Sequence, residues 1–103
     1  MIATEISRDA DGNIRAFTVR SHGKDIICAA VSMLVINTVN SIETLTSEPF
    51  DCDYDENGGF LCFSLHSAVP GREAALLLDA MLLGLRSVRE RYEKQIEIKE
   101  VVI

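Results

Sequence analysis

Residues 25–46, DIICAAVSMLVINTVNSIETLT, decide the fold. Their apolar side chains recur at steps of three and four residues, which is the spacing of one face of an α-helix. This stripe consists of Ile27, Val31, Leu34, Thr38, Ile42 and Leu45. Asp25 is a good N-cap residue, and Glu48-Pro49 ends the segment. The pattern therefore predicts a helix over residues 25–46, with Cys28 in its first turn.

Short strands surround this helix. Alternating residues predict strands over residues 1–7 and 14–20, joined by the turn signal Asp11-Gly12. In the second strand we expect one face to hold Ile14, Ala16 and Thr18, and the other to hold Phe17 and Val19. Residues 50–54 and 60–65 predict a second hairpin after the helix.

A second helical pattern follows the breaker Pro70-Gly71, over residues 72–92. We expect its buried face to consist of Ala75, Leu78, Leu82, Leu85 and Val88. Residues 95–102 alternate as a last strand, with Lys99-Glu100 as a candidate irregularity. The order ββαββαβ predicts an α+β fold, with two helices packed on one face of a mostly antiparallel sheet. Because no linker divides the chain, we predict a single domain over residues 1–103.

Composition is typical of a soluble globular protein, with 48% hydrophobic and 25% charged residues. The longest apolar run is interrupted by Asn37, Asn40 and Glu43, so we expect no membrane span. The first residues, MIATEISRD, have neither the basic start nor the apolar stretch of a secretion signal. We therefore expect a cytoplasmic protein without a membrane partner.

Charge and cysteine usage exclude further classes. The net charge is −6 and no basic stripe is present, which disfavours direct binding of nucleic acid. The three cysteines contain no CxxC pair, so neither a zinc site nor a disulfide framework is predicted. We expect free thiols and no metal.

Cys28 and His22 are the residue types that a cysteine nucleophile requires. An imidazole can take the thiol proton, and a helix N-terminus stabilises the resulting thiolate. The segment between the two residues is long enough for the chain to bring ring and sulfur together. The peptide N–H groups near Cys28 could also receive an oxyanion. On physical grounds alone, an inert buried cysteine remains the more common explanation.

Three neighbours have candidate supporting roles. Asp25 either caps the helix or orients the His22 imidazole, and the two roles are compatible. Ser32 lies one turn beyond Cys28 on the same helix face, close enough to hydrogen-bond or to shape a pocket floor. Gly23 supplies backbone freedom to the loop, or simply makes a turn.

The run KDIICAAVS at residues 24–32, after a strand that leads to a histidine, resembles the ribosomal-processing cysteine protease family, Prp. Its members carry Asp-Ile-Val-Cys-Ala-Ala-Val-Ser at the start of the first helix. The similarity covers the whole chain, including VNSIE at 39–43, the turn ENGGF at 56–60 and LLLDAMLLGLRSV at 76–88. The block around the cysteine is specific, whereas the pattern of the second helix alone would not be.

This resemblance implies a cytoplasmic cysteine endopeptidase, generally a homodimer, that needs no metal or cofactor. It also implies the substrate, a large-subunit ribosomal protein precursor that loses a short N-terminal extension after a hydrophobic, aromatic-ended motif. Carried over by residue, Cys28 is the nucleophile and His22 the general base, and then the acid for the leaving amine. Asp25 and Ser32 match the supporting positions.

The chain departs from the family pattern in two places. Ser21 replaces the usual glycine before the histidine. The loop between His22 and Cys28 lacks the Ala-Gly-x-Ala-x-x-Gly portion, which in the family lies over the site. This shorter loop is the departure that bears most on substrate binding.

Two other functions compete with proteolysis. One is a non-catalytic module that binds a ribosomal protein segment, and the other is a redox-responsive thiol protein that uses Cys28. Of the remaining candidates, we expect Cys62 in the core, Cys52 packed or partly exposed on its strand, and His66 solvated in a loop. The acidic run at residues 51–56 is expected to be a solvated strand and turn.

Overall fold

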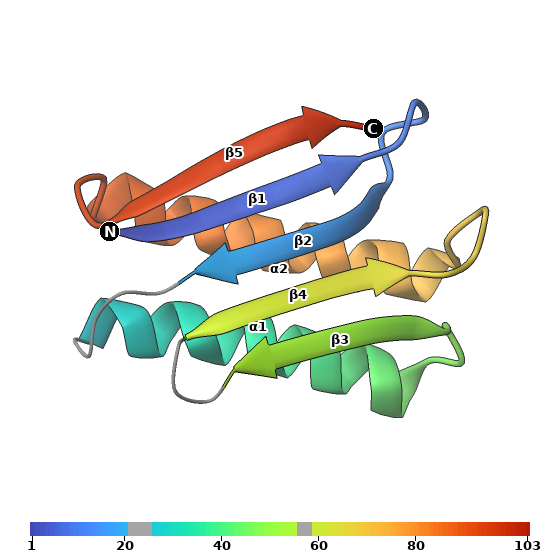
Figure 1. Ribbon diagram of the computed structural model, residues 1–103. Helices are drawn as coiled ribbons and strands as arrows, with labels where there is room; N and C mark the ends of the chain where they lie inside the picture. The colour runs from blue at the N-terminus through green and yellow to red at the C-terminus, as the bar shows by residue number, and fades with distance from the viewer. Residues whose placement is uncertain (21–25, 56–58) are drawn as a thin grey trace.

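The computed structural model describes residues 1–20, 26–55 and 59–103 of the chain. Its elements follow the predicted order ββαββαβ (Figure 1). They are β1 (Ile2–Arg8), β2 (Ile14–Arg20), α1 (Ile26–Leu45), β3 (Phe50–Asp55), β4 (Phe60–Leu65), α2 (Arg72–Arg91) and β5 (Ile96–Val102). The predicted α+β fold is therefore confirmed.

The strands form one sheet in the order β3-β4-β2-β1-β5, so that β3 and β5 are its edges. β1 pairs with β2, β2 with β4 and β3 with β4, all antiparallel, whereas β1 and β5 are parallel. The β1–β5 pairing runs in continuous register from Ile2↔Ile96 to Arg8↔Val102. The prediction of an irregularity at Lys99-Glu100 is therefore wrong.

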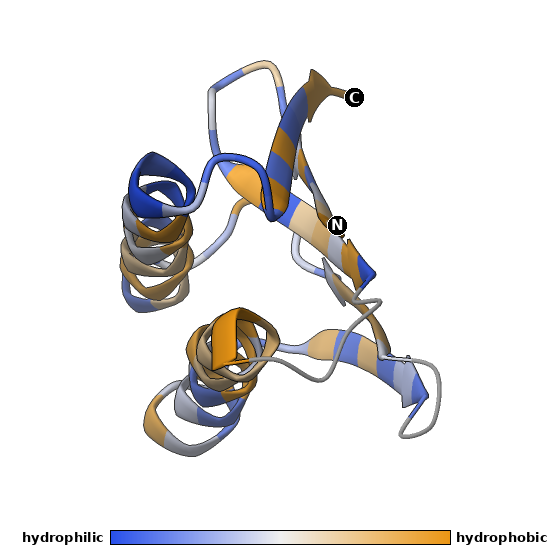
Figure 2. Cartoon of the chain, turned by 90° about the vertical axis from the view of Figure 1, so that its left-hand side faces the viewer, coloured by the Kyte–Doolittle hydropathy of each residue, from blue (hydrophilic) through white to orange (hydrophobic). Residues whose placement is uncertain are grey.

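Both helices cover the same face of the sheet, which gives the molecule two layers (Figure 2). The core between the layers is apolar, and the rings of Phe17 and Phe63 stack at its centre with centroids 5.0 Å apart. The helices approach each other closely at Gly84, where an added Cβ would lie 2.9 Å from Leu34 Cδ2. A side chain at this position would force Leu34 to move.

A bulge in the first hairpin makes the predicted assignment of residues to the two faces of β2 wrong for Ile14. Ser7 pairs with Ala16 and Arg8 pairs with Ile14, which leaves Arg15 as an extra residue. One extra residue shifts the alternation of side chains, because successive residues of a strand point to opposite faces. Ile14 is therefore buried on the same side as Phe17, and not opposite to it as the alternation predicted.

The buried face of α1 also differs from the predicted stripe. Val35 and Val39 are buried, whereas Leu45 is 72% exposed because it is the last residue of the helix. By length and mean hydropathy α1 could cross a membrane. Its buried face, however, packs against the core of the domain, which accounts for the apolar residues on that face.

The start of α2 is capped from outside the helix. Its N-cap residue, Gly71, has no side chain to cap the helix. Instead, the Glu48 carboxylate accepts hydrogen bonds from the Gly71 N–H and the Ser67 hydroxyl, each at 2.5 Å. Glu48 precedes β3, so this contact ties the α1–β3 connection to α2.

Candidate active site

Cys28 is the third residue of α1. Ile27 beside it is buried and anchors the first turn, whereas Ala29 and Ala30 are exposed. Cys28 itself is half-buried and packs against the core. The first turn of a helix carries N–H groups without intrahelical acceptors and the positive end of the helix dipole. Cys28 therefore lies at the end of the helix where the dipole favours negative charge.

Ser32, one turn further along α1, lines a cavity of about 290 Å³ between the helix and the sheet. The other lining residues are Val19, Val35, Ile36, Tyr54, Asp55, Gly59, Phe60 and Leu61. They come from α1, from the end of β2 and from the β3–β4 hairpin. Ser32 is thus placed as predicted, at the side of a pocket close to the N-terminus of α1.

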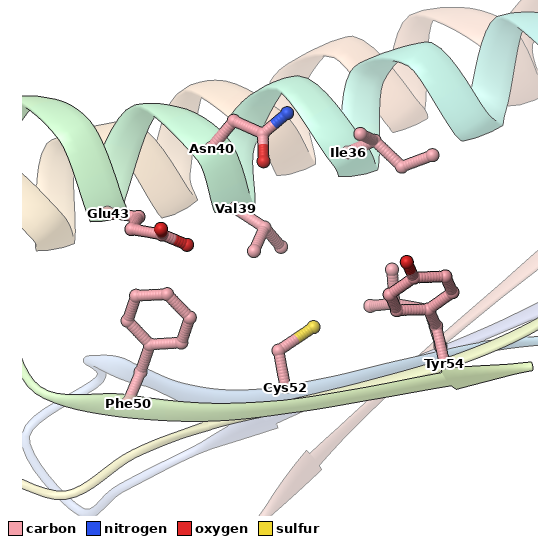
Figure 3. A pocket seen from close by; sticks show the side chains of 8 residues that line it. Ile36, Val39, Asn40, Glu43, Phe50, Cys52 and Tyr54 are labelled. Carbon is pink, nitrogen blue, oxygen red and sulfur yellow. The ribbon is translucent and has the colours of Figure 1, made fainter.

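A second cavity of about 450 Å³ continues along α1 away from Cys28 (Figure 3). Its lining consists of Ile36, Val39, Asn40, Glu43, Phe50, Cys52, Tyr54 and Leu61. Ile36, Tyr54 and Leu61 border both cavities. The two cavities therefore adjoin, and together they form a cleft between α1 and the β3–β4 hairpin, which we call the α1 cleft.

Three predicted site residues, His22, Gly23 and Asp25, lie outside the described residues. The same holds for most of the ENGGF turn, of which Gly59 and Phe60 are described. The roles proposed for these residues stay predictions.

The other histidine, His66, lies far from Cys28. It follows β4, whose first residue, Phe60, lines the cavity beside Ser32. The six residues of β4 extend about 17–20 Å, so His66 lies near the opposite end of the cleft. Its ring Nε2 is 2.6 Å from Asp51 Oδ2, and its side chain is half exposed, in agreement with the predicted solvated position. His66 is therefore not a base for Cys28.

The two other cysteines differ in their surroundings. Cys52 lines the α1 cleft, where burial, and then the charge of Asp53, raise the pKa of its thiol. A raised pKa disfavours the thiolate, which makes Cys52 a poor nucleophile. Cys62 alternates with the buried Phe63 and so faces away from the helices, half-exposed. The expectation that Cys62 is in the core is wrong, because that side of the sheet carries no second layer.

The sequence pattern missed the residues that line the cleft. The strand β3, FDCDYD, supplies Phe50, Cys52 and Tyr54 on one face and has Asp51 and Asp53 on the other. This alternation was the available signal, although the acidic residues suggested only a solvated strand.

Within residues 1–20, 26–55 and 59–103, no group of three His, Cys, Asp or Glu side chains is arranged to hold a metal ion. A thiol at a helix N-terminus, one turn from an apolar cleft, is an arrangement that hydrolases with a cysteine nucleophile use. The chain belongs to the family described as cysteine protease Prp, whose model matches residues 1–97. It is a cysteine protease.

Relatives and solved structures support this assignment over nearly the whole chain. The ribosomal processing cysteine protease Prp of Staphylococcus aureus is 34% identical over 105 residues, covering 95% of this chain and 97% of the relative. The Bacillus subtilis protein of the same name is 27% identical over 113 residues and all of both chains. The crystal structure of Prp from S. aureus with a covalently linked product peptide superposes with a TM-score of 0.90 at 33% identity, covering 97% of this chain and 99% of that one. A structure of the same protease with a substrate peptide gives 0.91 at 30% identity, with the same coverage.

Proposed function

We propose that this protease removes a short N-terminal extension from a large-subunit ribosomal protein, cutting after a hydrophobic, aromatic-ended motif. The position of Cys28, at the N-terminus of α1 and one turn before Ser32 of the apolar α1 cleft, is the observation that carries the proposal. The S. aureus and B. subtilis relatives are named for ribosomal processing, which supports the substrate class. Apolar walls suit an apolar recognition motif.

In the proposed reaction, the Cys28 thiolate attacks the carbonyl carbon of the scissile peptide bond. The oxyanion that forms is held by N–H groups of the first turn of α1. His22, having taken the thiol proton, gives it to the leaving amine, and a thioester with the new C-terminus remains. Water, deprotonated by His22, then hydrolyses the thioester and regenerates the thiol.

His22 is supported as the base by elimination and by connectivity. The chain holds two histidines, and His66 lies near the far end of the cleft. His22 follows β2 closely, and Val19 of β2 lines the same cavity as Ser32 of α1. In this proposal Asp25 caps α1 or orients the imidazole, Ser32 shapes the pocket, and Gly23 gives the loop its freedom.

The test uses a synthetic peptide with an extension that ends in two aromatic residues, followed by a short basic stretch. Products are identified by mass spectrometry for the wild type, Cys28→Ala, His22→Ala and, as a matched control, Cys62→Ala. We expect one cut after the aromatic pair, a loss on the order of a thousandfold or more in the first two variants, and full activity in the control. Binding without cleavage in any protein would instead support a peptide-binding module. Reversible oxidation of Cys28 that does not need His22 would support a redox role.

We also infer that the protease is a cytoplasmic homodimer that does not bind nucleic acid directly. Apolar side chains exposed on the outer sides of the helices, including Met33, Leu76 and Leu83, support association with a second copy. The net charge of −6 argues against binding a phosphate backbone. Light scattering at micromolar concentration tests the dimer, and a monomeric mass would contradict it.

A further inference from the structure

We propose that the exposed carboxylates around the α1 cleft form a docking surface for the basic part of the substrate, the segment that follows the scissile bond. This inference rests on the proposed function and deepens it. The surface consists of Glu43 on α1 and of Asp51, Asp53 and Asp55 on β3, and we call it the acidic rim.

The negative charge of the protein is concentrated in the part of the chain that builds the α1 cleft. Residues 25–71 contain seven of the sixteen aspartates and glutamates and none of the ten lysines and arginines. This segment, which includes α1, β3 and β4, therefore carries a formal charge of −7, although the whole chain carries −6. Figure 1 shows the three elements together on one side of the molecule. Charge of one sign gathered on one side produces a field that attracts partners of the opposite sign.

On the other side of the sheet the charges are paired within the chain. The Glu100 carboxylate on β5 accepts hydrogen bonds from Arg8 at 3.1 Å and from Arg86 at 2.8 Å. Such pairs cancel most of each other's field at a distance. The remainder of the chain is therefore nearly neutral and well paired, and the charge surplus belongs to the cleft side.

The acidic rim lacks this internal neutralisation. Asp51 Oδ2 is 2.6 Å from Nε2 of His66, whose ring is charged only when protonated. Among the described residues, no lysine or arginine forms an ion pair with Glu43 or Asp53. Like charges held close together repel one another, so a basic partner that binds them is favoured.

The acidic rim is also open to a partner as large as a protein. β3 is an edge of the sheet, and the face that carries Asp51 and Asp53 has no second layer (Figure 2). The Asp51 side chain is 73% exposed. Asp55 lines the cavity beside Ser32, whereas Glu43 borders the cavity at the opposite end of the α1 cleft. The rim therefore follows the whole length of the cleft.

The chemistry of the proposed substrate identifies the occupant. A ribosomal protein lies against RNA, and proteins bind a nucleic acid backbone by neutralising phosphates with lysine and arginine. Its mature part is therefore basic, and this part begins directly after the scissile bond. Ser32, about 6 Å along α1 from Cys28, borders the same cavity as Asp55. A scissile bond at Cys28 thus brings the basic segment to one end of the acidic rim.

The first experiment changes the charge of the substrate after the cut. Three peptides share the extension, the aromatic pair and the next two residues, and then carry three lysines, three glutamines or three glutamates. At about 20 mM salt we expect kcat/KM to be roughly tenfold higher for the lysine peptide than for the glutamine peptide, and lower again for the glutamate peptide. Because salt screens exposed charges, the advantage of lysine should fall below about twofold at about 0.5 M salt.

The second experiment removes charge from the acidic rim without touching the cleft. Asp51→Asn and Asp53→Asn are combined, since both side chains lie on the face of β3 away from the cavities. The matched control combines Glu5→Gln and Glu97→Gln, two exposed carboxylates on the same face of the sheet but on β1 and β5. β1 lies three strands from β3, about 14 Å away, which exceeds the screening length of about 10 Å at 0.1 M salt.

At this salt concentration the rim variant should lose roughly threefold in kcat/KM on the lysine peptide and nothing on the glutamine peptide. The control should behave as the wild type on both. Asp53→Lys should go further and raise kcat/KM for the glutamate peptide while lowering it for the lysine peptide. Damage to the fold cannot produce such an exchange, because it would lower the rate on every peptide.

A binding measurement separates docking from chemistry. In the Cys28→Ala protein, fluorescence anisotropy of labelled peptides should show tighter binding of the lysine peptide than of the glutamine peptide, by a factor that falls with salt. With saturating peptide, the wild type should cleave both at the same kcat, because the acidic rim does not touch the reacting atoms.

The outcomes separate this inference from the function on which it rests. Equal kcat/KM for the lysine and glutamine peptides at low salt, an equal loss in the control variant, or no gain for the glutamate peptide with Asp53→Lys would overturn the acidic rim and leave the protease intact. If the wild type cleaves none of the peptides, the proposed function fails, and the acidic rim as a docking surface for its substrate fails with it.

Discussion

The two helices lie on the same face of one sheet but differ in how they meet it. α2 contacts β2 and β5, and its buried residues Leu78, Met81, Leu82 and Leu85 are each at most 2% exposed. α1 buries one face in the core, yet between it and the β3–β4 hairpin the α1 cleft stays open. The packing therefore differs on the two sides of the molecule. α2 closes its part of the core, whereas α1 leaves an open space that is large enough for a ligand.

This difference separates the residues that determine stability from those that line the α1 cleft. Close packing makes each buried side chain of α2 costly to truncate. The side chains of the cleft already border empty space, so their truncation creates little new cavity. Substitutions on the two sides should therefore affect different measurements.

The largest effect on stability is expected for Leu85→Ala in α2. Leu85 is 0% exposed, and its truncation should lower the free energy of unfolding by about 3 kcal/mol through lost burial and a new cavity. Leu83→Ala, two residues away and 66% exposed, should change it by less than about 0.5 kcal/mol. Urea denaturation of both variants checks the prediction, and equal values would contradict close packing under α2.

A smaller loss is expected where Glu48 links the two sides. In Glu48→Ala the Gly71 N–H and the Ser67 hydroxyl lose their acceptor at the start of α2. We expect a cost of about 1–2 kcal/mol in the free energy of unfolding. Glu48→Gln keeps an acceptor oxygen and should lose less. The same denaturation series decides this, and a wild-type midpoint for Glu48→Ala would show that the contact does not stabilise α2.

Ile36→Ala tests the cleft side of the comparison. Ile36 is 47% exposed, and alanine has the higher helix propensity. The free energy of unfolding should therefore change by less than about 1 kcal/mol. Because Ile36 lines both cavities, KM for the peptide should nevertheless rise several-fold. Thermal melts and steady-state kinetics on one preparation measure both. A large loss of stability with unchanged KM would mean that the cleft belongs to the core.

The smallest effect is expected from the pH dependence of an ion-pair cluster on the α2 side. The Arg86 hydrogen bond, and then that of Arg8, hold the pKa of the Glu100 carboxyl below its ordinary value of 4.5. Because the pKa is lower in the folded state, the carboxylate contributes stability above pH 4.5, and this contribution is lost as the pH falls through the folded-state pKa.

Since these side chains are a quarter to nearly half exposed, Glu100→Gln should cost only a few tenths of a kcal/mol at pH 7. The difference between variant and wild type should shrink towards pH 3, as measured by denaturation at several pH values. A difference that grows on acidification would have the wrong sign.

Much of the fold was predictable because local patterns and tertiary packing agree. Period-two alternation and the turn signals located β1 to β5, and the helical spacing located α1 and α2. The prediction failed where one residue changed the phase, as with Arg15 in the bulge that buries Ile14. It also failed for Cys62, because alternation within a strand does not tell which face of a sheet is covered.

By itself the sequence determined the order of the elements, the position of Cys28 at the start of a helix and the resemblance of the surrounding block to a protease family. These features depend on residues close together in the chain. Only the tertiary structure decided that Ser32, Tyr54 and Leu61 border one cleft, and that His66 lies away from Cys28. The physical reason is that a cleft is the space between elements distant in sequence, and its shape depends on how closely a helix packs on a sheet.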